Sequence, residues 1–116
     1  MNQELEALDK LVHPHIVHVL DLVEDNDNHY IVMEYMLHGN LRQKLAKIQD
    51  TRSQFKEADA AKLIYQILIA LNYLHKQNIV HRDLKLDNIM VDLQKINDQE
   101  TNLVCKLTDF GFAKAL

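Results

Sequence analysis

Hydrophobic and polar residues alternate in blocks along this chain of 116 residues, and their spacing predicts a mixed α+β fold. Leu5, Leu8 and Leu11 recur at helical spacing, and Pro14 prevents this first helix from continuing much beyond residue 13. A broad apolar stripe predicts a long and largely buried helix over 57–76. The stripe consists of Ala60, Leu63, Ile64, Ile67, Leu68, Leu71 and Leu74.

Two runs rich in β-branched and apolar residues occupy 16–23 and 30–35, and turn-forming residues fill 24–28 between them. This pattern predicts a β-hairpin. After an interruption at 36–39, an asparagine suited to helix capping opens a short helix over 40–48.

The second half of the chain supplies the remaining elements. Asn78 is suited to the left-handed conformation that ends a helix, whereas Lys56 is a poor amino-terminal cap for the long helix. Apolar runs at 89–91 and 103–108 predict two strands, and the polar residues of 92–102 predict an excursion between them.

The richest chemistry lies in His81-Arg82-Asp83-Leu84-Lys85-Leu86-Asp87-Asn88 and in Thr108-Asp109-Phe110-Gly111. Asp83 can accept the proton of a hydroxyl group, and Lys85 can lie along a transferring phosphate. Asn88 and Asp109 offer the hard oxygen ligands that Mg²⁺ prefers. The alternative is that 81–88 forms an ordinary polar turn between two apolar runs.

These two motifs resemble the catalytic loop and the metal-binding motif of the eukaryotic protein kinases, and the resemblance extends over nearly the whole chain. It implies an α+β, two-lobed kinase fold that is truncated here. Residues 1–35 would be a remnant of the amino-terminal lobe, 36–40 the hinge and 41–116 the first part of the carboxy-terminal lobe. It also implies a cytoplasmic enzyme that uses ATP, Mg²⁺ and a protein substrate.

The resemblance assigns chemical roles residue by residue. It makes Asp83 the catalytic base, Lys85 the cation on the γ-phosphate, and Asn88 and Asp109 the Mg²⁺ ligands. Glu4 would pair with a phosphate-binding lysine that this chain does not contain, although Glu4 can also be read as an exposed helix carboxylate. Lys85 resembles the serine/threonine kinases, because tyrosine kinases usually carry alanine there.

The same resemblance places adenine against the end of the predicted hairpin. Met33 would be the gatekeeper, while the carbonyl of Glu34 and the backbone of Met36 would bond the adenine edge. Asn40 would touch the ribose, and Met90 would pack under the base. For the methionines, core packing is the alternative interpretation.

The histidines invite acid/base and metal-binding interpretations. By resemblance, His81 instead packs in a buried column with Leu8, Val19 and Phe110. The histidines within 13–18 lack Asp or Cys ligands close by in the sequence, so a metal site is the weaker interpretation.

Composition narrows the class of protein. The 17 acidic and 13 basic residues give a formal charge of −4, and the basic residues form no run, which disfavours nucleic-acid binding. No apolar stretch reaches about 18 residues, so we expect no membrane span. Cys105 is the single cysteine and lies in an apolar run, which indicates a buried, reduced thiol.

Glycine usage is low, with Gly39 and Gly111 where average usage gives about eight. The chain therefore holds no glycine-rich phosphate cradle, and at 116 residues it is less than half of the kinase domain that it resembles. Three hypotheses follow: a segment of an active serine/threonine kinase, a catalytically dead kinase-like module that acts by binding, or a small-molecule phosphotransferase. The last class usually lacks Asp-Phe-Gly and Lys85. The hairpin and the long helix lack the neighbouring strands and helices on which they would pack, so we expect apolar faces exposed to water and an isolated chain that is aggregation-prone or molten.

Overall fold

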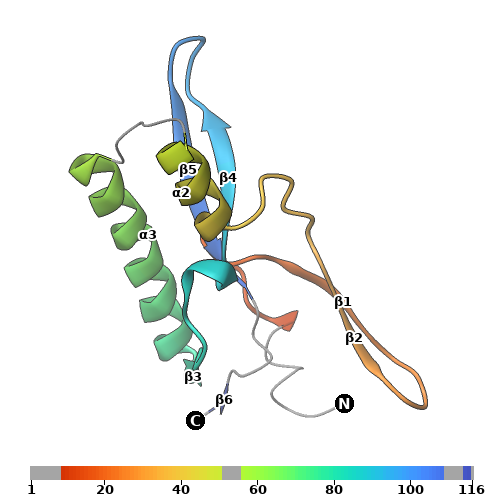
Figure 1. Ribbon diagram of the computed structural model, residues 1–116. Helices are drawn as coiled ribbons and strands as arrows, with labels where there is room; N and C mark the ends of the chain where they lie inside the picture. The colour runs from red at the N-terminus through yellow and green to blue at the C-terminus, as the bar shows by residue number, and fades with distance from the viewer. Residues whose placement is uncertain (1–8, 51–55, 109–113, 116) are drawn as a thin grey trace.

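The computed structural model describes residues 9–50, 56–108 and 114–115 (Figure 1). The first helix predicted around Leu5 and Leu8 lies outside these residues. In the described part, three two-stranded antiparallel sheets pair β1 with β2, β3 with β6, and β4 with β5. The elements in chain order are β1 (Val19–Glu24), β2 (His29–Met33), α2 (Leu41–Asp50), α3 (Glu57–Lys76), β3 (Ile79–Val80), the short 3₁₀ helix η1 (Leu86–Asn88), β4 (Ile89–Lys95), β5 (Thr101–Leu107) and β6 (Lys114–Ala115).

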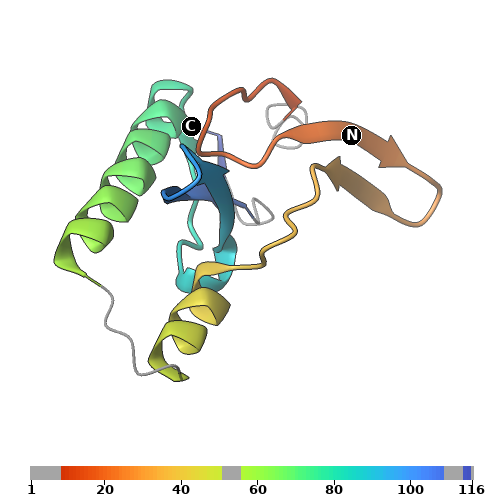
Figure 2. The same cartoon turned by 90° about the horizontal axis from the view of Figure 1, so that it is seen from above.

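The β1–β2 hairpin extends away from the helices, as Figures 1 and 2 both show. Its turn is fixed by Asp25, whose Oδ1 accepts the backbone N–H groups of Asp27 at 2.9 Å and Asn28 at 2.7 Å. These bonds, with one from the Tyr30 hydroxyl, lower the pKa of Asp25. The predicted hairpin is confirmed, with each strand ending within three residues of its predicted bounds.

A reciprocal cap begins α2. Asn40 Oδ1 accepts the Gln43 N–H at 2.9 Å, and Gln43 Oε1 accepts the Asn40 N–H at 3.0 Å. Such a cap stabilises a helix by about 1 kcal/mol. Gly39 precedes it with a positive φ of 74°, and a Cβ at this position would collide with the Gln43 side chain. The glycine is therefore required both by its backbone conformation and by the cap.

The long helix α3 begins and ends where the apolar periodicity predicts. Lys56 provides no side-chain cap, and the Gln77 N–H bonds the carbonyls of the last turn. Asn78 takes the left-handed conformation, with φ 61°, as predicted.

The prediction of a largely buried helix holds for only part of the apolar stripe of α3, and the expectation that some of its apolar face is exposed to water is confirmed. Leu63, Ala70 and Leu74 are at most 4% exposed, whereas Ile64 and Leu68 are 56% and 57% exposed. The physical reason is that the described elements cover α3 from one side, where β5 and β3 pack against it (Figure 1). Neither α3 nor α2 is long and apolar enough to cross a membrane.

The β4–β5 hairpin is longer than predicted, because its ladder continues into the residues expected to form a polar excursion. The register runs from Ile89 opposite Leu107 to Lys95 opposite Thr101. The turn is closed by Asn97, whose Oδ1 accepts two backbone N–H groups at 2.8 Å. Polar side chains on an exposed ribbon do not prevent backbone pairing, so a polar run was a poor signal for a loop here.

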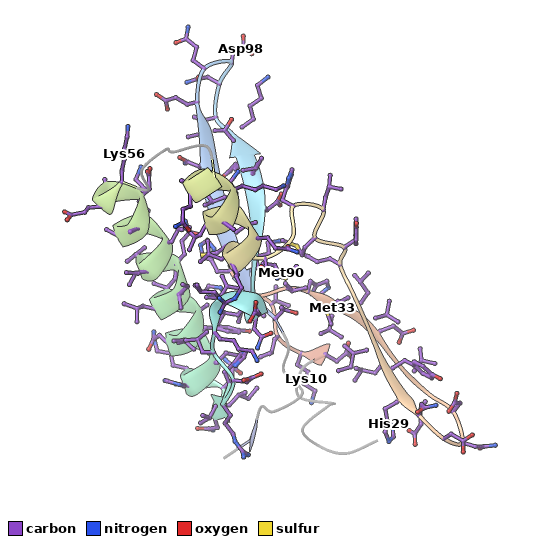
Figure 3. All side chains as sticks on the ribbon, in the orientation of Figure 1. Lys10, His29, Met33, Lys56, Met90 and Asp98 are labelled. Atoms are coloured by element: carbon purple, nitrogen blue, oxygen red, sulfur yellow. The ribbon has the colours of Figure 1, made fainter. Side chains whose placement is uncertain are left out.

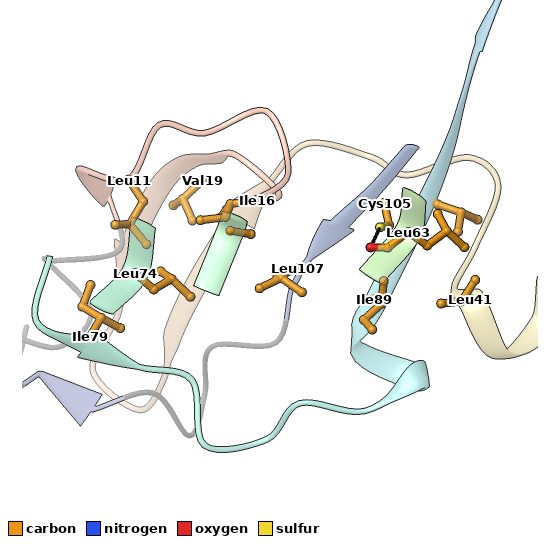
Figure 4. Close-up of a cluster of buried hydrophobic side chains, with 12 residues drawn as sticks. Leu11, Ile16, Val19, Leu41, Leu63, Leu74, Ile79, Ile89, Cys105 and Leu107 are labelled. Atoms are coloured by element: carbon orange, nitrogen blue, oxygen red, sulfur yellow. Dashed lines mark hydrogen bonds between the residues drawn. The ribbon is translucent and has the colours of Figure 1, made fainter. Parts of the chain in front are cut away.

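The core lies where α3, β4 and β5 meet the segment before β1 (Figure 4). Cys105 is 1% exposed, which confirms the predicted buried thiol. Its Sγ donates to Gln66 Oε1 at 3.3 Å, and burial raises its pKa to about 11. The buried apolar side chains are Leu11, Ile16, Val19, Leu41, Leu63, Ala70, Leu74, Ile79, Ile89, Val91, Cys105 and Leu107.

The exposed side of α3 predicts self-association of the isolated chain. Ile64, Tyr65 and Leu68 are more than half exposed and lie within about one helical turn of each other. We expect a purified sample of the 116 residues to bind a hydrophobic dye and to form oligomers in sedimentation experiments. A sharp, cooperative thermal transition at a temperature independent of protein concentration would contradict this.

Candidate active site

The loop between β3 and η1 is anchored by His81, which is 2% exposed. Its Nδ1 accepts the backbone N–H of Asp83 at 3.1 Å, so the ring proton lies on Nε2, which donates to the Thr108 carbonyl at 2.8 Å. The predicted column partners Leu8 and Phe110 lie outside the described residues. Both ring nitrogens make structural bonds, which favours the packing role of His81 over acid/base chemistry.

We expect His81→Leu to lower the free energy of unfolding by about 1–3 kcal/mol, because it leaves the Thr108 carbonyl and the Asp83 N–H without this partner. Chemical denaturation of the full-length protein measures this difference. His38 is exposed, so His38→Leu is the matched control and should change stability little. Equal stability of the two variants would show that the buried bonds do not hold the loop.

Asn88 turns the loop back on itself. Its side-chain nitrogen Nδ2 donates to the Asp83 carbonyl at 2.8 Å and to the carboxylate oxygen Oδ2 of the same residue at 3.0 Å. The turn of η1 makes this possible, because the Asn88 N–H bonds the Lys85 carbonyl at 2.9 Å. Asn88 is 5% exposed, so this amide is fixed within the fold.

Lys85 lies on the other side of the same carboxylate. Its ammonium group is 3.8 Å from Asp83 Oδ1, and the Asp83 side chain is 25% exposed while that of Lys85 is 52% exposed. The structure therefore brings Asp83, Lys85 and Asn88 together, as their spacing predicts. A carboxylate that is held in place and still 25% exposed can accept a proton from a bound hydroxyl group.

The residues suit a magnesium ion beside this carboxylate. Both side-chain bonds of Asn88 come from its nitrogen, which leaves its carbonyl end as a hard oxygen donor of the kind Mg²⁺ prefers. The Thr108 N–H donates to the backbone carbonyl of Asn88 at 3.0 Å, so the residue that follows β5 lies against the loop. Asp109 follows Thr108 directly but lies outside the described residues, as does Glu4.

Of the predicted adenine-contacting residues, Met33 and Met90 lie on strands β2 and β4 (Figure 3), and the others, Glu34, Met36 and Asn40, lie in the connection between β2 and α2. Met33 is the last residue of β2 and is 39% exposed, and its sulfur lies 3.5 Å from the Thr108 hydroxyl. Met90 lies in β4 and pairs with Asn40 through an isolated β-bridge. Asn40 uses its side-chain oxygen to cap α2, and its amide nitrogen is the group that could donate to a ribose. Met36 is half-buried in the connection between β2 and α2.

Two ion pairs between distant parts of the described chain were not anticipated from the sequence. Arg42 Nε lies 2.7 Å from Asp87 Oδ1 and joins α2 to η1, and Lys106 Nζ lies 2.6 Å from Glu34 Oε1. Both pairs join residues distant in the sequence, for which local spacing carries no signal. The reciprocal partner of Asn40, by contrast, could have been found, because Gln43 stands at the third helical position of a capping box.

Comparison with known proteins decides the family. The protein kinase domain model matches residues 1–116. The calcium/calmodulin-dependent protein kinase cmkA of Emericella nidulans is 45% identical over 113 residues, which are 97% of this chain and 25% of that protein. Serine/threonine-protein kinase 33 of Mus musculus is 39% identical over 114 residues, or 97% of this chain and 22% of that protein. The chain belongs to the protein kinase family.

The kinase relatives are much longer than this chain. An Aurora kinase of Debaryomyces hansenii is 37% identical over 111 residues, covering 96% of this chain and 24% of that protein. The chain thus spans about a quarter or less of the length of these relatives. The prediction of a protein kinase domain related to serine/threonine kinases is confirmed.

Proposed function

We propose that this chain carries the catalytic loop, the magnesium ligands and the hinge of a serine/threonine protein kinase that transfers the γ-phosphate of ATP to a protein hydroxyl. The observation that carries the proposal is the pair of hydrogen bonds from the Asn88 side-chain amide to the carbonyl and the carboxylate of Asp83. The Lys85 ammonium lies beside the same carboxylate. This arrangement combines a base, a cation and a hard oxygen ligand within one loop.

The proposed chemistry follows from these positions. Asp83 accepts the proton of a serine or threonine hydroxyl. The hydroxyl oxygen then forms its bond to the γ-phosphorus while the bond between that phosphorus and the ADP oxygen breaks. Lys85 offsets negative charge on the transferring group. Asn88 and Asp109 would hold Mg²⁺, which when bound neutralises phosphate charge.

The nucleotide base is proposed to lie at 36–40, the hinge between an amino-terminal part (1–35) and a carboxy-terminal part (41–116). Met33 would be the gatekeeper, and the backbone of Glu34 and Met36 would bond the adenine edge. The order of elements supports this, because the connection after β2 leads directly to the Asn40–Met90 bridge. Glu4 would pair with the phosphate-binding lysine of a complete kinase domain.

The proposed site is tested by titrating the full-length protein with ATP twice, once in the presence of Mg²⁺ and once with a chelator that removes it. We expect ATP to bind roughly tenfold more tightly with Mg²⁺, a difference of about 1.4 kcal/mol. The wild-type protein without nucleotide provides the baseline. Equal affinity with and without Mg²⁺, or no binding in either condition, would overturn the proposed metal and nucleotide site. Binding without phosphoryl transfer would favour the alternative of a kinase-like binding module.

A further inference from the structure

The ion pair of Lys106 and Glu34 differs from the other described ion pairs in its burial. The two side chains are 20% and 29% exposed, and Lys106 Nζ donates to Glu34 Oε1 at 2.6 Å. By comparison, the members of the Arg42–Asp87 pair are 60% and 44% exposed. A pair that has lost much of its water is less screened by salt, so it can hold geometry that a surface pair cannot.

Strand alternation explains how Lys106 reaches this position. Cys105 and Leu107 point into the core and are each 1% exposed, so Lys106 points to the opposite face of β5. Glu34, directly after β2, lies near this strand, because the Glu34 N–H donates to the His18 carbonyl at 2.9 Å and the adjacent Val17 N–H donates to the Leu107 carbonyl of β5 at 2.9 Å. The pair therefore joins strand β5 to Glu34, two residues before the proposed hinge.

The carboxy-terminal end of the proposed hinge, at Gly39 and Asn40, is attached to β4, the strand that pairs with β5. The Val91 N–H donates to the Gly39 carbonyl at 2.9 Å, next to the bridge between Asn40 and Met90. Residues 34–40 are thus held at both ends by the β4–β5 hairpin. At the Gly39 end the link is made by backbone groups, whereas at the Glu34 end the side-chain ion pair adds a direct link to β5 beside the backbone bond with His18.

We propose that Lys106 is a positioning residue, which fixes the backbone of Glu34 relative to the end of β5. The inference rests on the proposed function, in which the Glu34 carbonyl bonds adenine and Asp109, three residues after Lys106, binds the metal. The ion pair then adds a side-chain link between the segment proposed to recognise the base and the strand that leads to the proposed metal ligand. Stability is a weaker explanation, since replacing a buried ion pair by apolar residues often leaves stability unchanged or improves it.

The test uses the full-length protein with Lys106→Met, with Glu34→Gln, and with the charges exchanged by K106E together with E34K. We expect each single variant to bind adenosine about fivefold to tenfold more weakly and the exchanged pair to recover most of the affinity. Hydrogen exchange at the Glu34 amide should become faster in both single variants and slower again in the exchanged pair. Lys95, whose contact with Asp98 is exposed, provides the control Lys95→Met, which should match the wild type.

The outcomes separate the two proposals. If the wild type binds adenosine and the single variants bind it equally well, or if the Glu34 amide exchanges at the same rate in all variants, the positioning role is overturned. If the wild type binds no nucleotide, the proposed function fails instead. The exchange rates then still decide whether the ion pair fixes this segment.

Discussion

Asp83→Asn should lower the rate of phosphoryl transfer by about 10²- to 10⁴-fold, which corresponds to roughly 3–5 kcal/mol of activation barrier. Asparagine has nearly the shape of aspartate, and its side-chain oxygen can still accept a bond from Asn88, which now lies 3.0 Å from Asp83 Oδ2. The asparagine lacks the basic carboxylate that receives the proton, and it also lacks the negative charge beside Lys85. The loss should therefore appear in kcat, with little change in the affinity for ATP.

Steady-state kinetics of the full-length protein with a serine peptide measure this effect. Asp92→Asn is the matched control, because Asp92 lies in β4 and its Oδ1 bonds the backbone N–H of Leu93, away from the loop. This control should keep its activity within about a factor of two to three. Undiminished kcat in Asp83→Asn would remove Asp83 from the role of base.

Asn88→Ala should have the second-largest effect, because the same side chain holds Asp83 and offers an oxygen to the metal. We expect activity to fall by roughly 100-fold or more, since metal ligation contributes several kcal/mol to the barrier reduction. Asn88 is 5% exposed, so the loss of its two hydrogen bonds to Asp83 should also lower the free energy of unfolding by about 1–3 kcal/mol.

Magnesium dependence separates the two functions of Asn88. Kinetics over a range of Mg²⁺ concentrations should show that Asn88→Ala needs more Mg²⁺ for half-maximal activity, while denaturation in the absence of metal reports the lost bonds to Asp83. Asn72 is exposed on α3, so Asn72→Ala controls for loss of an amide. An unchanged requirement for Mg²⁺ in Asn88→Ala would argue against Asn88 as a metal ligand.

Sequence reasoning was reliable where the information is local. The bounds of α3 follow from apolar periodicity, and the left-handed Asn78 follows from the preference of asparagine for that conformation. The sequence places Asp83 and Asn88 in one loop, but the bonds between them depend on the turn of η1, which the sequence analysis did not predict.

Sequence reasoning was weak where distant parts of the chain decide the outcome. Periodicity identifies the apolar stripe of α3 but does not say which of its residues neighbouring elements cover, so only the structure shows that Leu63 is buried while Ile64 and Leu68 are exposed. The pairing of Lys106 with Glu34 spans 72 residues and leaves no local pattern. The length of the β4–β5 ladder depends on backbone pairing, which the polar side chains of 94–102 do not reveal.

The most direct test of the account is transfer of labelled γ-phosphate from ATP to a peptide library by the full-length protein with Mg²⁺. We predict that the label appears on serine and threonine and that Asp83→Asn abolishes nearly all of it, whereas Asp92→Asn does not. Absence of label on any peptide, from a protein that is folded and binds ATP with Mg²⁺, would contradict the assignment of Asp83, Lys85 and Asn88 as a phosphoryl-transfer site.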